Sequence, residues 1–318
     1  MRKAVDRARE RIARDIRLTP CRPSPALTGA TGAEIYLKLE NLQASGSFKI
    51  RGVANKIRSL DESKSHRQLI AASTGNHAAA FAHVVQKLGL RGKLFLPETA
   101  APVKIRAIED YGVPYEMVGQ DCVQTELHAA DYAREHGCVV IKPYNDPEIV
   151  AGQGTIAAEL LDQLDGFDTV LVPIGGGGLI SGIAAFLKEI APEITVIGCQ
   201  PVNSCVMYES LQAGTIVDIE SLPTLSDATA GGIEPGSITF DLCREFVDDF
   251  IMVSEEEIMA AIRLVYAAEK MAIEGGAALT VAALLKERAR FEEKRAVLII
   301  SGGKIDDAVL KEIGCGHD

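Results

Sequence analysis

Short apolar runs alternate with longer amphipathic segments along most of the chain. Residues 169–173 form a continuous apolar run, for example, and apolar residues at helical spacing resume at residue 179 after four glycines. Such runs predict strands at residues 35–40, 69–72, 93–96, 114–118, 138–141, 169–173, 195–199 and 296–300. Helical patterns cover residues 1–10, 50–57, 76–88, 103–111, 121–136, 148–164, 179–190, 204–213, 240–246, 255–273 and 277–291. This alternation is typical of an α/β fold with a parallel sheet covered by helices on both faces.

Two runs of predicted strands divide the chain, whose 318 residues are too many for one small core. We place domain boundaries near residues 60 and 145. Residues 1–60 and 146–318 would form a large domain, and residues 61–145 a small one. Residues 214–237 show no regular pattern and are rich in Gly, Pro, Ser and Thr. An irregular segment of this length is usually functional.

The composition excludes several classes of function but does not identify one. Hydrophobic residues make up 47% of the chain and charged residues 24%, as in ordinary soluble proteins. The net charge of −11, without a dense Lys/Arg run, argues against nucleic-acid binding. No apolar stretch approaches the roughly 18 residues of a membrane-spanning helix, and the charged N-terminal segment lacks the apolar core of a secretion signal. The seven cysteines show no zinc-like spacing, so we expect reduced thiols in a cytoplasmic protein.

Lys49 stands at an unusual place, in the first turn of a predicted helix for which Ser47 is a candidate N-cap. The positive end of the helix dipole disfavours a cation there and would lower the pKa of the Lys49 amine. A neutral lysine amine attacks carbonyl groups and forms a Schiff base. Taken alone, Lys49 would more simply be a solvated helix lysine, so the rest of the chain must decide.

Four glycines, Gly175, Gly176, Gly177 and Gly178, lie between a predicted strand and a predicted helix. Backbone N–H groups converge at such a turn and the helix start adds its dipole, which suits a phosphate. The run lacks the Lys-Ser/Thr pair of a nucleotide P-loop and does not match G-x-G-x-x-G. A tight turn that allows close helix packing is the structural alternative.

Two further polar turns follow predicted strands. Residues 73–77 carry two hydroxyls, an amide and a histidine, which suits a carboxylate or a ring oxygen, although a helix-capping turn would also explain them. Ser301 precedes two glycines and could bond a ligand ring nitrogen. A carbonyl-attacking lysine, a phosphate site and polar turns at strand ends together indicate a cofactor with an aldehyde and a phosphate. Pyridoxal 5′-phosphate has both.

Five motifs resemble those of fold-type-II pyridoxal-phosphate enzymes of the threonine/serine dehydratase and serine racemase family. In order along the chain they are SFKIRG at residues 47–52, STGNH at 73–77, AGQGT at 151–155, GGGGL at 175–179 and SGG at 301–303. The resemblance implies a two-domain fold like that of tryptophan synthase β, with the cofactor in the cleft between domains, and a homodimer. It further implies an ammonia-lyase that removes water from a β-hydroxy-α-amino acid of the threonine or serine type, leaving a keto acid and ammonia.

The same resemblance implies a role for each residue of the site. Lys49 would bind the cofactor and take the Cα proton, with Phe48 packed near the ring. Asn76 would bond the ring's 3′-oxygen, and Ser301 the ring nitrogen. The phosphate would be held by Gly175, Gly176, Gly177, Gly178 and Leu179. The substrate carboxylate would be held by Ser73, Thr74, Gly75 and His77.

Three departures from the family pattern change these expectations. Gln200 and Val206 replace two carboxylates of the family's divalent-metal site, so we predict no metal there. Thr74 replaces the serine that serves racemases as a base on the opposite face. Its hydroxyl could still transfer a proton, but its methyl group crowds the site and disfavours racemisation. Lys304 replaces a frequent asparagine, and we expect it to point to solvent.

Residues 225–240 look most like dehydratases of hydroxyectoine utilisation, with the form Ser-Asp-x-x-Ala-Gly-Gly-Ile-Glu-Pro-Gly. Hydroxyectoine has no primary amine, but its ring-opened derivative is a β-hydroxy-α-amino acid, as is 3-hydroxyaspartate. Asp227 or Glu234 would then recognise a substrate amine; alternatively, Asp227 caps the loop and Glu234 is solvated. Glu274 matches a family glutamate near the cofactor.

Two other functions stay open at this point. An amino-acid racemase on the same scaffold is disfavoured by Thr74 and by the missing metal carboxylates. A non-catalytic ligand-binding relative would hold no covalent cofactor. Amino-acid catabolism in the cytoplasm is the setting that the dehydratase reading implies.

Overall fold

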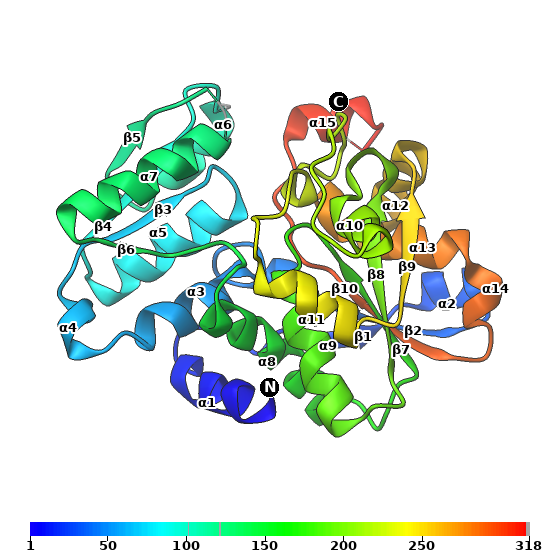
Figure 1. The fold of residues 1–318 in the computed structure, drawn as a ribbon. Coiled ribbons are helices and arrows are strands. Elements are labelled where there is room, and N and C mark those ends of the chain that lie inside the picture. Colours follow the sequence, from blue (N-terminus) through cyan, green and yellow to red (C-terminus); the bar gives the residue numbers. More distant parts are fainter. Residues whose placement is uncertain (101, 121, 316–318) are drawn as a thin grey trace.

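The computed structural model describes residues 1–100, 102–120 and 122–315, which form two α/β units (Figure 1). The larger unit contains a six-stranded sheet in the order β1-β2-β10-β7-β8-β9, and the smaller a four-stranded sheet in the order β5-β4-β3-β6. All neighbouring strands are parallel except β1 and β2. The larger sheet consists of β1 (Cys21–Pro23), β2 (Glu34–Lys38), β7 (Thr169–Pro173), β8 (Thr195–Pro201), β9 (Asp249–Val253) and β10 (Arg295–Ile299). The smaller consists of β3 (Leu69–Ala72), β4 (Gly92–Leu96), β5 (Tyr115–Met117) and β6 (Val139–Val140). The predicted α/β architecture is confirmed.

Helices cover both faces of the larger sheet, where two separate apolar cores form. Other helices, such as α5 and α7, pack on the smaller sheet. The helices are α1 (Arg2–Ile12), α2 (Pro25–Thr31), α3 (Lys49–Arg58), α4 (Glu62–Ser65), α5 (Asn76–Leu88), α6 (Pro102–Glu109), α7 (Cys122–His136), α8 (Pro147–Gln163), α9 (Gly178–Ile190), α10 (Val206–Ala213), α11 (Ile238–Phe246), α12 (Glu255–Glu269), α13 (Gly275–Lys286), α14 (Arg288–Phe291) and α15 (Asp307–Glu312). Single 3-10 turns are η1 (Glu40–Leu42), η2 (Val202–Ser204) and η3 (Asp227–Thr229). Among these helices, none combines the length and apolar character that a bilayer crossing needs.

The structure departs from the predicted elements in a few places. The pattern does not predict β1, α2, α4 or β9; the last is a short strand at the sheet edge that begins with Asp249. The helix predicted for residues 255–273 ends at Glu269, because Lys270 adopts the left-handed conformation with φ of 54°. The helix predicted for residues 277–291 breaks at Glu287 into α13 and α14. Asp121, the predicted start of another helix, lies outside the described residues.

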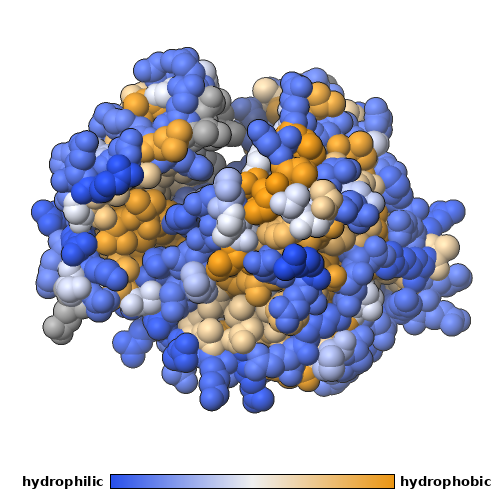
Figure 2. Space-filling view, viewed as in Figure 1, coloured by the Kyte–Doolittle hydropathy of each residue, from blue (hydrophilic) through white to orange (hydrophobic). Residues whose placement is uncertain are grey.

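The strand order brings distant parts of the sequence together. β10 lies between β2 and β7 and runs parallel to both. The carboxyl ends of these three strands therefore meet at one edge of the sheet, where they lead toward Lys49, Ser301 and Gly175. In the smaller sheet, β3 and β6 are also parallel, and lead to residues 73–77 and 142–145. Figure 2 shows the molecular surface hollowed between the two units.

Helix α3, which begins at Lys49, packs against α5 of the smaller unit and against α8. Glycines allow the close approach to α8. A Cβ atom on Gly152 would lie 2.7 Å from the Arg51 carbonyl oxygen, and one on Gly52 would lie 2.5 Å from Nε2 of Gln153. The motif at residues 151–155 thus serves helix packing. Because α3 contacts both units, the boundary near residue 60 stays a prediction, as does the one near 145.

A buried group of two cations and two carboxylates fixes α3 against its neighbouring elements. The Arg51 guanidinium donates to both oxygens of Glu40 at 2.7 Å, and to the two oxygens of Glu159 at 2.6 and 2.8 Å. Lys38, also fully buried, pairs with Glu159. The four formal charges cancel, and the hydrogen bonds offset much of the cost of removing them from water. The group joins β2, η1, α3 and α8.

Replacing Arg51 with methionine is expected to lower the free energy of unfolding by about 3–5 kcal/mol, because two buried carboxylates lose their main counter-charge. Urea denaturation of the variant and the parent protein measures the difference. Arg14→Met is the control, since Arg14 is exposed and its side chain forms no hydrogen bond with the described residues. It should change the stability by no more than about 0.5 kcal/mol. Similar small effects for both variants would contradict the account.

Candidate active site

Lys49 is the first residue of α3, but the helix start differs from the predicted one. Phe48 occupies the N-cap position with helical backbone angles and forms no side-chain capping bond. The hydroxyl of Ser47 is buried and has no partner among the described residues. The prediction of Ser47 as N-cap is therefore wrong, because the cap lies one residue later. A buried hydroxyl without a partner is left beside Lys49.

The Lys49 amine lies in a partly buried position between the two units. Its Nζ donates to the Pro143 carbonyl oxygen at 3.0 Å and lies 5.3 Å from the centroid of the Phe48 ring. Burial lowers the pKa of Lys49 to about 8, against the opposing effect of the Glu274 carboxylate. A useful fraction of the amine is therefore neutral near neutral pH, as attack on a carbonyl requires.

The glycine loop at residues 175–178 offers unpaired backbone donors at the start of α9. The N–H groups of all four glycines lack acceptors in the described part of the chain. Gly177 has φ of 83°, a conformation that favours glycine, and a Cβ on Gly176 would lie 2.5 Å from the Tyr144 ring. Leu179 follows in the first turn and is buried. Free N–H groups at the positive end of a 13-residue helix fit the phosphate of the cofactor.

The loop that carries Ser301 is joined to the loop before Lys49. The Phe48 N–H donates to the Ser301 carbonyl oxygen at 3.0 Å, and the Gly303 N–H donates to that of Gly46 at 3.1 Å. Ser301 itself is buried, and its hydroxyl forms no hydrogen bond with the residues the structure describes. A free, buried hydroxyl this close to Lys49 fits the predicted partner of a ring nitrogen.

Asn76 is held by Glu274, across the space between the units. The Asn76 Nδ2 atom lies 2.8 Å from each carboxylate oxygen of Glu274. Burial raises the pKa of Glu274 to about 7, although the bond from Asn76 opposes this, and the charge of Asp227 adds to it. A Cβ atom on Gly302 would lie only 2.2 Å from Glu274 Oε1. Glu274 thus brings Asn76 next to the Ser301 loop.

The turn at residues 73–77 lies between β3 and α5, where Ser73, Thr74 and Gly75 are half-buried. Gly75 is the N-cap residue of α5, so neither hydroxyl caps the helix. His77 is buried, and its Nε2 must carry the proton because it faces the Ile141 carbonyl oxygen at 2.8 Å. Burial, with a smaller effect of Lys49, lowers the pKa of His77 to about 3. Its buried Nδ1 is then only an acceptor, so the ring itself offers no free donor to a carboxylate, and the contact between His77 and the substrate stays a prediction.

The loop at residues 225–240 reaches the site from the larger unit. Asp227 is exposed on η3, and its charge acts on Glu274. Glu234 is not simply solvated: it forms an ion pair with Lys142 at 2.6 Å. Lys304 is exposed as a residue, but its aliphatic chain lies on Gly46, where a Cβ would lie 3.0 Å from Lys304 Cε. Burial lowers the pKa of the Lys304 amine, against the opposing effect of the Glu274 carboxylate, so the amine does not simply point to solvent.

Sequence reasoning missed Pro143 and Tyr144, which contact Lys49 and the glycine loop. The signal that could have found them is their place directly after the predicted strand at residues 138–141. This is the same strand-end position that singles out Ser301 and residues 73–77.

Gln200 and Val206 do not form a polar cluster. The Gln200 amide donates to the Ile174 carbonyl oxygen at 3.4 Å and accepts from the Tyr208 N–H at 3.0 Å, while Val206 is buried. Within the described ranges, no three His, Cys, Asp or Glu side chains gather as a metal site would require.

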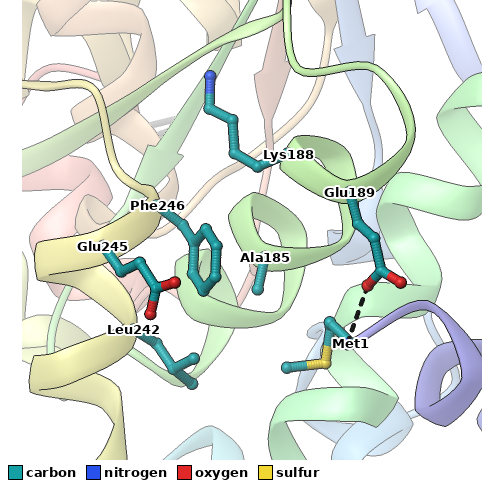
Figure 3. A pocket seen from close by; sticks show the side chains of 7 residues that line it. All are labelled: Met1, Ala185, Lys188, Glu189, Leu242, Glu245 and Phe246. Atoms are coloured by element: carbon teal, nitrogen blue, oxygen red, sulfur yellow. Dashed lines mark ion pairs between the residues drawn. The ribbon is translucent and has the colours of Figure 1, made fainter.

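A separate groove of about 430 Å³ lies between the chain start, α9 and α11 (Figure 3). It is lined by Met1, Ala185, Lys188, Glu189, Leu242, Glu245 and Phe246. The amino group of Met1 pairs with Glu189 at 2.9 Å. The groove lies at the carboxyl end of α9, whereas the glycine loop lies at the amino end, so it shares nothing with the chemistry around Lys49.

Comparisons with known proteins show which family the chain resembles. Residues 12–302 match the model of a family described as pyridoxal-phosphate dependent enzyme. The L-threonine ammonia-lyase of Thermotoga maritima is 40% identical over 290 residues, which cover 91% of this chain and 72% of that protein. A catabolic L-threonine dehydratase of Staphylococcus aureus is 38% identical over 306 residues, covering 95% and 88%. The structure of maize serine racemase superposes with a TM-score of 0.92 at 32% identity, covering 98% and 95%.

The low pKa of Lys49 can be measured without cofactor. In the apoenzyme, the rate at which an amine-reactive reagent labels Lys49 should reach half its maximum near pH 8, because burial favours the neutral amine. The reference is a lysine in an unstructured model peptide, whose labelling midpoint is about pH 10.4. Mass spectrometry of each labelled peptide gives both curves. A Lys49 midpoint equal to that of the model peptide would show that the amine is not desolvated.

Proposed function

The chain belongs to the family of pyridoxal-phosphate-dependent enzymes of fold type II, and on that premise we propose that it is a dehydratase acting on a β-hydroxy-α-amino acid. The products would be a keto acid and ammonia, after loss of water from the β-carbon. The observation that carries the proposal is the partly buried Lys49 amine, with a pKa of about 8. It bonds Pro143, whose neighbour Tyr144 packs on the glycine loop with its unpaired N–H groups, and it follows Phe48, which is bonded to Ser301. The similarity to threonine ammonia-lyases supports the reaction class.

The residues of the site divide the work of binding between them. When bound, pyridoxal phosphate draws electron density from the substrate Cα and so acidifies its proton. The N–H groups of residues 175–178 would hold the phosphate, and Phe48 would pack near the ring. The Ser301 hydroxyl would donate to a neutral ring nitrogen, whereas a carboxylate partner would keep that nitrogen protonated. Asn76, oriented by Glu274, donates to the 3′-oxygen.

Lys49 supplies both the amine that exchanges with the substrate amine and the base that takes the Cα proton. The Pro143 carbonyl oxygen orients Nζ while leaving its lone pair free for that task. Thr74, in the turn at residues 73–77, would be the base on the opposite face, and its hydroxyl is crowded by a methyl group. One efficient base at Cα favours elimination, whereas racemisation needs a second on the other face.

The substrate we infer from residues 225–240 is a β-hydroxy-α-amino acid with a larger side chain than threonine, such as a ring-opened hydroxyectoine derivative. Asp227, exposed on η3 and close enough to act on Glu274, is placed to recognise a polar end of that side chain. Glu234 is engaged by Lys142 and is no longer our candidate for that contact. Threonine, serine and 3-hydroxyaspartate are the simpler alternatives.

A keto-acid and ammonia assay of the holoenzyme tests the reaction. Candidate substrates are threonine, serine, 3-hydroxyaspartate, phenylserine and 3-hydroxy-2,4-diaminobutyrate derivatives. At least one should yield both products in equal amounts, and Lys49→Ala should lower the rate by at least about 10³-fold, because it removes both the nucleophile and the base. Inactivity of the holoenzyme on the whole set would reject the lyase function.

Racemisation is the second candidate, favoured by the similarity to maize serine racemase. Chiral analysis of recovered substrate separates the two: dehydration predicts keto acid forming faster than the opposite enantiomer appears. Thr74→Ser should raise the share of racemisation by removing the methyl group. Racemised substrate outpacing keto acid in the parent enzyme would reverse the assignment. The homodimer that the family resemblance implies remains a prediction, which light scattering can test.

A further inference from the structure

Glu234 connects the loop at residues 225–240 to the short segment that joins the two units. Its carboxylate accepts from Lys142 Nζ at 2.6 Å and from Asn145 Nδ2 at 2.7 Å. Its own N–H donates to the Tyr144 hydroxyl at 2.8 Å. A fourth bond, from the Ile238 N–H to Asn145 Oδ1 at 3.1 Å, fixes the far end of the same loop. Both carboxylate oxygens of Glu234 are therefore engaged by the protein itself.

The segment that Glu234 grips, residues 142–145, follows β6 of the smaller unit and precedes α8 of the larger. In Figure 1 the chain passes here from one unit to the other. Such a crossing is where relative motion of two units changes backbone angles. Four hydrogen bonds from one loop restrict that freedom.

The same four residues hold the two groups that contact the candidate site. The Pro143 carbonyl oxygen accepts from Lys49 Nζ at 3.0 Å. Tyr144 lies against the glycine loop, so that a Cβ on Gly176 would meet its ring at 2.5 Å and one on Gly178 would meet its Cβ at 2.9 Å. A shift of residues 142–145 would therefore disturb both the lysine and the phosphate loop.

We propose that Glu234 is a positioning residue that holds residues 142–145 where Pro143 orients the Lys49 amine and Tyr144 supports the glycine loop. It touches neither cofactor nor substrate, and acts through the backbone it fixes. The inference rests on the proposed function only because Pro143 and Tyr144 are taken to serve a cofactor site. Its structural part, the coupling of two segments through one carboxylate, is independent of the reaction.

Hydrogen exchange and cofactor titration on the full-length protein test this role. In the apoenzyme, Glu234→Ala should speed exchange about tenfold or more in peptides covering both residues 141–146 and residues 225–240. The Kd for pyridoxal phosphate should rise about fivefold or more, because the glycine loop loses its support. Lys142→Met, which removes the ion pair from the other side, should shift both quantities in the same direction.

Two further variants sharpen the comparison. Glu234→Gln keeps the shape and an acceptor for Asn145 but loses the charge, so its effects should lie between those of the parent and Glu234→Ala. It also serves as the test if the alanine variant fails to fold. Glu220→Ala is the matched control, since Glu220 is exposed in the same irregular segment and forms no hydrogen bond with the described residues. Its exchange rates and cofactor Kd should stay within about twofold of the parent.

The outcomes are distinct. Faster exchange in residues 225–240 alone, with an unchanged cofactor Kd, would make Glu234 a loop anchor and overturn the proposal. So would exchange rates like those of Glu220→Ala. If the parent enzyme forms no keto acid while the exchange and Kd effects appear, the proposed reaction fails and the positioning role of Glu234 stands.

Discussion

The buried grip of two carboxylates on Arg51 is the interaction on which the candidate site depends. Glu40 and Glu159 bond the guanidinium from two sides, and Lys38 completes the charge balance. Because Arg51 lies two residues after Lys49, this grip fixes the start of α3 relative to β2 and α8. A lysine that must keep its amine unprotonated and available needs a rigidly held backbone. A fully paired ionic group supplies that rigidity at a place where an apolar side chain would specify direction less strictly.

The parallel sheet brings the other loops of the site together. Three adjacent strands, β2, β10 and β7, end at the same edge, so the loops with Lys49, Ser301 and the glycines are neighbours in space despite their distance in sequence. The smaller unit contributes Asn76 and Pro143 from the ends of its own strands. The site therefore lies between the units, and each half carries groups that the other lacks. Glu274 and Glu234 link the halves through Asn76 and through Lys142.

Local patterns predicted most of the fold because the hydrophobic periodicity of most segments matches the helix or strand that they form. The predicted bounds of the helix at residues 76–88 and of the strand at residues 169–173 agree with the structure, because glycines flank the helix and the apolar run delimits the strand. The site loops were found because chemistry at strand ends is a local feature as well. What the sequence could not supply is pairing across long separations. Asn76 meets Glu274, and His77 meets Ile141, through tertiary packing alone. That packing decides which nitrogen of His77 carries the proton, and so directs the ring's donor away from a substrate carboxylate.

The central claim is that Lys49 carries the cofactor. Borohydride reduction of the protein loaded with pyridoxal phosphate, followed by peptide mass mapping, tests it most directly. The account predicts loss of the visible absorbance band and a single reduced cofactor adduct, on Lys49, because its amine is desolvated and its helix begins at the loop that is bonded to Ser301. An adduct on Lys304, Lys142 or another lysine, or no adduct at all, would contradict it.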